Sequence, residues 1–344
     1  EGGSTMKRKG RGMATIMFGF GYGEGFPDHS IASVEIEEGG KILIRTAAAD
    51  VGQGILTIIT QITAEVLRVK PEIIEVIPAD TYLTKSSGSS SATRQTYFTG
   101  NAVKKAAEEL LAKIYHYASL EFRSSHPELG LEEGNIFRYE DPNTKLSYWE
   151  LAERVKARGD NLKAEASFFP QTDKPDPKTG QGKKVYVAYT FVTQIIDIEV
   201  DTDTGIVEVL KVYTAADIGK AINPQNVEGQ IEGGTVQGIG MALMEEQVIK
   251  EGITLNPDLT SYLIPTSMDT PHFTTRLIEN EDSEGPYGAK GIGEPATIAT
   301  APAIANAIYN AIGVRIYHLP ITPEKILNAL KEETKNKREK KEDF

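Results

Sequence analysis

One carboxylate in this sequence stands in a setting that suits acid–base chemistry. Glu294 lies in the stretch Gly291-Ile292-Gly293-Glu294-Pro295, directly before an apolar segment, 296–312, whose spacing predicts a helix. An acid at this place can simply interact with the helix dipole. The glycines and Pro295 fix the backbone, however, and the helix is apolar on most faces, so we expect the carboxylate to be buried. Burial raises the pKa of a carboxyl group toward the range of a general base.

Four loops rich in glycine or small polar residues each precede a predicted helix, at 50–54, 86–96, 217–226 and 286–295. Helix N-termini offer unpaired N–H groups, glycine allows close approach of a ligand, and hydroxyl side chains add donors. We therefore expect the loops to converge on one anionic ligand, such as a phosphate-bearing cofactor. Considered singly, DVGQG at 50–54 is typical of a tight turn, and the serine run is typical of a linker.

Several other chemistries are disfavoured by composition. Cysteine is absent, which excludes thiolate catalysis, cysteine zinc sites and cysteine-ligated iron–sulfur clusters in this chain and fits a cytoplasmic protein. The five histidines lack the spacing of metal ligands, so no metal held by side chains is predicted. A net charge of −12 argues against nucleic-acid binding, and no apolar run is long enough for a membrane span. No loop matches the phosphate-binding motif of nucleotide-triphosphate enzymes or the dinucleotide motif.

The segments that must position these loops follow one order twice. Each half is predicted to contain a hairpin, a helix, a short strand and a second helix, which gives an α+β fold of two β-β-α-β-α repeats. In the first half the predicted strands are 30–36, 41–46 and 73–78, and the helices are 55–69 and 100–122. In the second half the strands are 185–200, 206–213 and 273–278, and the helices are 227–249 and 296–312.

Three units follow from this order. The first repeat, 12–184, includes a less regular stretch, 125–184, with a loop at 170–184 rich in proline, glycine and lysine that is read as an insertion. The second repeat, 185–334, carries Glu294 and ends in a helix from Pro323 to about Lys335, with Thr322 as its N-cap. The charged tail, 335–344, is predicted to be solvated or frayed. Residues before Met6 are left out of the fold prediction.

Four motifs, taken together and in this order, resemble a known family. They are DVGQG at 50–54, SSSATRQT followed by TGNAV at 89–103, DIGKAINPQNVEGQIEGGTVQGIG at 217–240, and GAKGIGEP at 288–295. Over residues 12–330 the chain resembles the C-terminal molybdopterin-binding half of the xanthine oxidase and xanthine dehydrogenase family. In that family the dithiolene of the pterin holds the molybdenum, so the resemblance needs no metal ligand from this chain.

The resemblance implies roles for ten residues. Glu294 matches the catalytic glutamate beside the molybdenum, where it acts as general base. Gln53 and Gln230 match glutamines that contact the pterin, and the run 90–93 matches the stretch that holds its phosphate end. The implied cofactor-binding residues are Gly52, Gln53, Gly54, Ser90, Ser91, Ala92, Thr93, Gln230 and Gly293.

The resemblance also implies a reaction and partners. It predicts a hydroxylase that adds a water-derived oxygen to an electron-poor carbon of an N-heterocycle such as a purine or nicotinate. The family's glycine-rich phenylalanine loop and arginine loop do not occur in this sequence, so an N-terminal molybdenum half or subunit is expected to share the cofactor. Partner chains would carry the [2Fe–2S] clusters and FAD. The pterin can be the mononucleotide or the cytosine dinucleotide form.

Three alternatives remain open. Within the family, the substrate can be an aldehyde or CO instead of an N-heterocycle. Outside catalysis, the chain can be a protein that stores or delivers molybdopterin, although such a protein has no need for a base at Glu294. An unrelated αβ domain with accidental glycine loops would not explain four ordered motifs.

Overall fold

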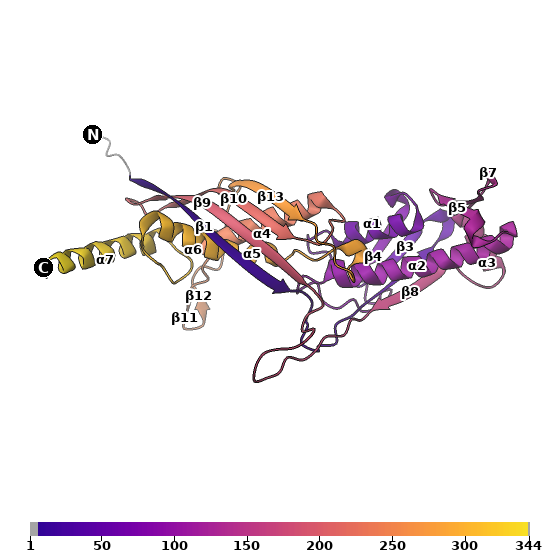
Figure 1. Cartoon of the computed structure of the whole chain (residues 1–344), viewed down its shortest axis with the longest axis horizontal. Helices are drawn as coiled ribbons and strands as arrows, with labels where there is room; N and C mark the ends of the chain where they lie inside the picture. The colour runs from indigo at the N-terminus through magenta and orange to yellow at the C-terminus, as the bar shows by residue number, and fades with distance from the viewer. Residues whose placement is uncertain (1–5, 343–344) are drawn as a thin grey trace.

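The structure, a computed structural model, describes residues 6–342. Two sheet-and-helix halves lie in a row and give an elongated molecule, and helix α7 (Pro323–Glu342) projects from one end (Figure 1). The fold class is α+β, as predicted. No described helix is both long and apolar enough to cross a membrane.

The first sheet has the strand order β4-β3-β2-β8. Strands β2 (Ser30–Ile36) and β3 (Ile42–Thr46) form the predicted antiparallel hairpin, β4 (Ile74–Pro78) is parallel to β3, and β8 (Lys163–Phe168) is antiparallel to β2. Helices α1 (Ile55–Leu67) and α2 (Gln95–Phe122) pack on this sheet. Their apolar faces bury a core that includes Ile44, Ile59 and Leu110, because helical spacing turns these side chains toward the sheet.

The second sheet has the strand order β13-β10-β9-β1. Strands β9 (Tyr189–Asp201) and β10 (Val207–Asp217) form a hairpin, β13 (His272–Ile278) is parallel to β10, and β1 (Lys7–Gly19) is antiparallel to β9. Helices α4 (Pro224–Leu243), α5 (Pro295–Ile298) and α6 (Thr300–Ile312) pack near one another, with α6 against β1 and β9. In both sheets, therefore, one parallel strand pair is followed by two antiparallel pairs. The last strand of the first sheet, β8, follows the others in the chain, whereas that of the second sheet, β1, precedes them.

Strand β1 was not predicted from the sequence. The charges at Lys7, Arg8, Lys9 and Arg11 hide its alternation, and its buried positions include two glycines, Gly10 and Gly12. A Cβ at Gly12 would lie 2.1 Å from the Ala303 carbonyl oxygen, so the absence of a side chain lets α6 approach the strand. Residues 12–19, which the sequence analysis placed in the first unit, thus pair with the sheet of the second.

The prediction of an irregular stretch at 125–184 is partly wrong. It contains β5 (Leu129–Glu132), β6 (Asn135–Arg138), β7 (Asp141–Ser147), α3 (Tyr148–Ala157) and β8. Short, polar strands carry little hydrophobic period, which is why the pattern missed them. Helix α3 had a readable signal, because Ser147 and Glu150 form a capping box. The predicted loop at 170–184 contains no helix or strand.

Helix ends differ from the prediction in several places. Helix α2 begins at Gln95 rather than near residue 100, and the predicted helix 296–312 is divided at Ala299. Helix α4 ends at Leu243 and is followed by a small hairpin, β11 (Ile249–Lys250) and β12 (Ile253–Thr254). Helix α7 continues through most of the charged tail, to Glu342. Its predicted cap is confirmed, since the Thr322 hydroxyl accepts the Lys325 N–H at 3.4 Å. Four 3-10 turns complete the described fold, at Glu38–Gly40, Pro71–Ile73, His126–Glu128 and Pro286–Gly288.

Candidate active site

A cavity of about 630 Å³ brings together most of the predicted site residues. Its walls come from the loop before α1, the loop and first turn of α2, the middle of α4, and the loop and start of α5. Eight of the ten predicted residues line it: Gly52, Gln53, Ser90, Ser91, Thr93, Gln230, Gly293 and Glu294. Gly54 and Ala92 adjoin these residues in the chain but are not part of the lining.

Three of the four predicted loops line the cavity, and the fourth does not. Residues 217–226 are not part of the lining; Gly219 pairs with Ala289, and the Asn223 side-chain amide donates to Gln61 Oε1 at 3.1 Å. Helix α4, which this loop introduces, lines the cavity instead through Gln230, Gly233, Gly234 and Gln237. The loop therefore serves to place α4 rather than to face the cavity.

The N-terminus of α1 is capped by a residue that the sequence analysis did not single out. Asp50 Oδ1 accepts the N–H groups of Gly52 and Gly54 at 2.9 and 3.3 Å, and its Oδ2 accepts the Leu56 N–H at 3.3 Å. Asp50 thus already pairs one N–H of the first turn of α1, that of Leu56, and two N–H groups of the loop before it. The Gln53 side chain turns toward its own loop, since its amide donates to the Ala49 carbonyl at 3.0 Å. Its contact with a pterin remains a prediction.

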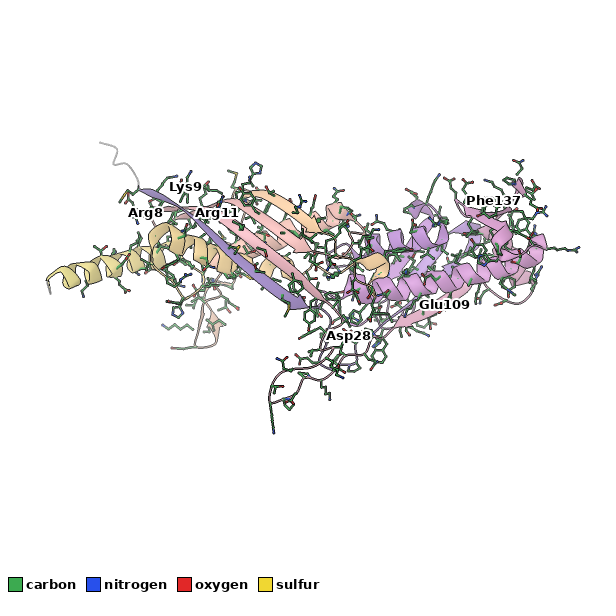
Figure 2. The ribbon with its side chains drawn as sticks, in the orientation of Figure 1. Arg8, Lys9, Arg11, Asp28, Glu109 and Phe137 are labelled. Atoms are coloured by element: carbon green, nitrogen blue, oxygen red, sulfur yellow. The ribbon has the colours of Figure 1, made fainter. Side chains whose placement is uncertain are left out.

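A buried ion pair supports the serine-rich loop before α2, residues 86–93, which we call the serine loop. Arg94 is fully buried and its guanidinium lies 2.6 Å from the carboxylate of Asp28, a residue at the junction of the two halves (Figure 2). Arg94 also donates to the carbonyl oxygens of Ser87, Ser89 and His29 at 2.5, 3.1 and 2.6 Å. The guanidinium has a fixed fork of donors, so one side chain can set the course of a whole loop. Sequence reasoning missed this pair because its members are far apart in the chain.

Tyr22 reaches the same loop from the segment after β1. Its hydroxyl contacts the Ser89 hydroxyl and lies 2.8 Å from that of Ser91, which in turn lies 2.8 Å from Ser89. The hydrogen bond with Ser89 holds the pKa of the Tyr22 phenol below its usual value. Of the two predicted phosphate-binding serines, Ser91 is therefore held by a chain of hydroxyl groups, whereas the Ser90 hydroxyl donates to the Ala49 carbonyl oxygen at 2.7 Å.

Glu294 lies on the cavity wall and is held by the serine loop. Its Oε1 accepts the Ala92 N–H at 3.2 Å, and its Oε2 accepts the Thr93 hydroxyl hydrogen at 2.5 Å. The expectation that Glu294 is buried is wrong for this chain, since the residue is exposed. Glu294 directly precedes α5, and although the helix is apolar, the residue lines the cavity and stays exposed.

The glycines around the cavity fall into two kinds. A Cβ at Gly234 would lie 2.7 Å from the Ala296 side chain, and one at Gly291 would lie 2.1 Å from the Thr93 carbonyl oxygen, so protein packing requires glycine at both. A Cβ at Gly52 or Gly233 would have no protein atom within 4 Å, and at Gly293 the nearest atom is 3.7 Å away. The left-handed φ of Gly52, 102°, by itself favours glycine at that position. At Gly233 and Gly293 neither packing nor a positive φ requires glycine, and a large cofactor rich in polar groups that approaches closely fits the glycine backbone, hydroxyl and amide groups of the lining.

Comparison with known proteins identifies the class of that ligand. A family model described as the molybdopterin cofactor-binding domain matches residues 1–271. The chain is 35% identical to a probable xanthine dehydrogenase component of Bacillus subtilis (strain 168) over 94% of its own length and 42% of the relative's. It is 34% identical to the gamma subunit of the 6-hydroxypseudooxynicotine dehydrogenase complex of Paenarthrobacter nicotinovorans, over 86% and 37% of the two lengths.

Solved structures agree with these sequence matches. Quinoline 2-oxidoreductase from Pseudomonas putida 86 superposes with a TM-score of 0.81 at 27% identity, over 95% of this chain and 42% of that chain. Aldehyde oxidoreductase from Desulfovibrio gigas superposes with a TM-score of 0.77 at 30% identity, over 94% and 33%. The fold and the resemblance stated from the four motifs are thereby confirmed. The chain spans about two fifths of the length of the relatives cited above.

Proposed function

Because the chain belongs to the molybdopterin cofactor-binding domain family of the xanthine dehydrogenase type, we propose that it forms one wall of a molybdenum hydroxylase active site with Glu294 as general base. The observation that carries the proposal is the cavity that places Glu294 beside glycines left open on the protein side. A storage or delivery protein, the alternative of another class, would explain the open glycines but not an oriented carboxylate among them.

The cavity lining supports a division of labour among the proposed cofactor contacts. Hydroxyl and amide groups of Ser90, Ser91, Gln53 and Gln230 would meet the polar edges of the cofactor, and the glycine backbone would let it approach closely. When bound, the molybdenum centre of this cofactor supplies the two-electron oxidation of the substrate. The chain itself supplies position and a base.

Glu294 has the chemistry that the proposed reaction needs from the protein. In its ionised form it accepts a proton from the water-derived oxygen that attacks the substrate carbon. Its hydrogen bonds with Ala92 and Thr93 fix the direction of the carboxylate before the substrate arrives, and such preorganisation lowers the cost of reaching the transition state.

The exposed side of Glu294 supports a proposal about partners. A general base works best where water is excluded, and Glu294 is exposed in the described chain. We propose that an N-terminal molybdenum half or subunit closes the cavity and that [2Fe–2S] and FAD chains accept the electrons. Two relatives are themselves named as subunits of larger enzymes, which supports a multi-chain assembly.

An N-heterocycle is the proposed substrate class. Relatives and structural neighbours named for xanthine, nicotine and quinoline support this choice, and one named for aldehydes keeps the aldehyde alternative in view. Turnover of the assembled enzyme on purine, nicotinate, quinoline and aldehyde substrates would separate them.

Glu294→Gln tests the proposed base. The amide has nearly the same size but cannot accept the proton, so turnover should fall by about 10²- to 10⁴-fold while cofactor content stays at the wild-type level. Glu228→Gln, an exposed site on α4 outside the cavity lining, is the matched control and should leave turnover unchanged. Wild-type turnover by Glu294→Gln would exclude Glu294 as the base.

A further inference from the structure

We propose that Thr93 is a positioning residue that clamps the Glu294 carboxylate, rather than a cofactor contact. The inference rests on the proposed function, because it assigns Thr93 a role only if Glu294 is the base. The resemblance gave Ala92 and Thr93 to the phosphate end of the cofactor. In the structure the same groups are directed to Glu294.

Three hydrogen bonds form the clamp. The Ala92 N–H donates to one carboxylate oxygen of Glu294 and the Thr93 hydroxyl donates to the other, at 3.2 and 2.5 Å. In return, the Thr93 hydroxyl oxygen accepts the Glu294 backbone N–H at 3.0 Å. The hydroxyl thus uses its hydrogen and one lone pair on a single residue. With its only hydrogen given to Glu294, it has none to donate to a phosphate oxygen.

The backbone that builds the clamp is strained. Ala92 and Thr93 both have positive φ, 51° and 54°. For a β-branched residue such as threonine this is a true outlier, because its Cβ crowds the backbone. Strain of this kind persists only where the surroundings hold it in place, and it is concentrated at functional sites. Here the conformation directs the Ala92 N–H and the Thr93 hydroxyl to the same carboxylate.

The two loops of the clamp are locked together by close packing. The position of a Cβ at Gly291 would lie 2.1 Å from the Thr93 carbonyl oxygen and 2.6 Å from its Cγ2. The Thr93 backbone therefore rests directly on the Gly291 backbone, three residues before Glu294. Arg94, the next residue after Thr93, is anchored in turn by Asp28. A shift of Thr93 would move the carboxylate, which would weaken catalysis without removing the base.

The test compares three variants in the assembled enzyme. Thr93→Val keeps the branched shape but loses the hydroxyl, and Thr93→Ser keeps the hydroxyl. Thr144→Val is the matched control, since the Thr144 hydroxyl also donates to a carboxylate, that of Asp141 at 2.6 Å, in β7, at the far end of the molecule from the second sheet (Figure 1). For each variant, kcat, KM, molybdenum content and amide exchange of residues 288–298 are measured.

Thr93→Val should lose about 10- to 100-fold in kcat, the range expected when a reacting group is misplaced by up to 1 Å. KM and molybdenum content should stay unchanged, and amide exchange around Glu294 should become faster even in cofactor-free protein. Thr93→Ser should restore most of the kcat and the slow exchange, and Thr144→Val should match wild type.

Other results would overturn the clamp in distinguishable ways. If Thr93→Val has wild-type kcat and exchange while Glu294→Gln is inactive, the clamp is refuted and the proposed function stands. If Thr93→Val loses molybdenum, the hydroxyl is a cofactor contact and the clamp is again refuted. If Glu294→Gln keeps wild-type turnover, the proposed function fails and the clamp fails with it.

Discussion

Gly233→Ala should stabilise the protein and at the same time weaken cofactor binding. Gly233 lies inside α4, where alanine is favoured over glycine by about 1 kcal/mol, and the new methyl group would meet no protein atom within 4 Å. The same open space is part of the proposed cofactor cavity. A methyl group forced against a bound ligand costs about 1–3 kcal/mol, which corresponds to a loss of about 5- to 150-fold in affinity.

Gly229→Ala is the control for this prediction. Gly229 lies one turn earlier in α4, also has no protein atom within 4 Å of a built Cβ, and does not line the cavity. Urea unfolding of cofactor-free protein should show a similar gain for both variants, and metal analysis of the purified enzyme should show loss of molybdenum only for Gly233→Ala. Full molybdenum content in Gly233→Ala would refute the reasoning that open glycines mark the cofactor surface.

Two further perturbations test the packing and the charge pairs. Gly291→Ala should lower kcat and stability together, because a Cβ there would lie 2.1 Å from the Thr93 carbonyl oxygen and displace it; normal turnover in a folded Gly291→Ala enzyme would contradict this. Arg11→Ala should make the free energy of unfolding depend less on pH in the acid range, because the hydrogen bond from Arg11 holds the pKa of Asp197 below its usual value. The pair stabilises the fold above the unfolded pKa of about 3.9, and this stabilisation is lost as the pH falls through the folded pKa. The urea midpoints of wild type and Arg11→Ala should therefore converge at low pH. A difference between the midpoints that does not change with pH would contradict this prediction.

The sequence predicted elements well where their hydrophobic period was strong. The hairpin of β2 and β3 and helix α1 lie close to their predicted residues because alternation and helical spacing are explicit there. Strand β1 was not predicted because charged side chains occupy its exposed positions and glycines occupy buried ones. Its place depends on β9 and α6, which lie far away in the chain.

Most of the residues predicted for the candidate site line one cavity, but the contacts that they make there were not predicted. Spacing before helices and the four motifs located the loops, and eight of the ten residues do line one cavity. Asp50 at the α1 terminus and the Asp28–Arg94 pair were missed, since side-chain direction and pairing across 66 residues leave no period in a sequence. The exposure of Glu294 could not be read either, because burial depends on what covers a loop and not on the loop alone.

The pairing of β1 with β9 has a consequence for the order in which this chain can fold. Gly19 is paired with Tyr189 and Lys7 with Asp201, so all four strands of the first sheet lie between β1 and β9 in the chain. At the usual speed of protein synthesis β1 must wait roughly 10–40 s for its partner to emerge. The four basic residues between Lys7 and Arg11 keep the waiting strand hydrated, and charge of this kind on an unpaired strand opposes edge-to-edge aggregation. The charges that hid the strand from sequence reasoning thus protect it while it has no partner.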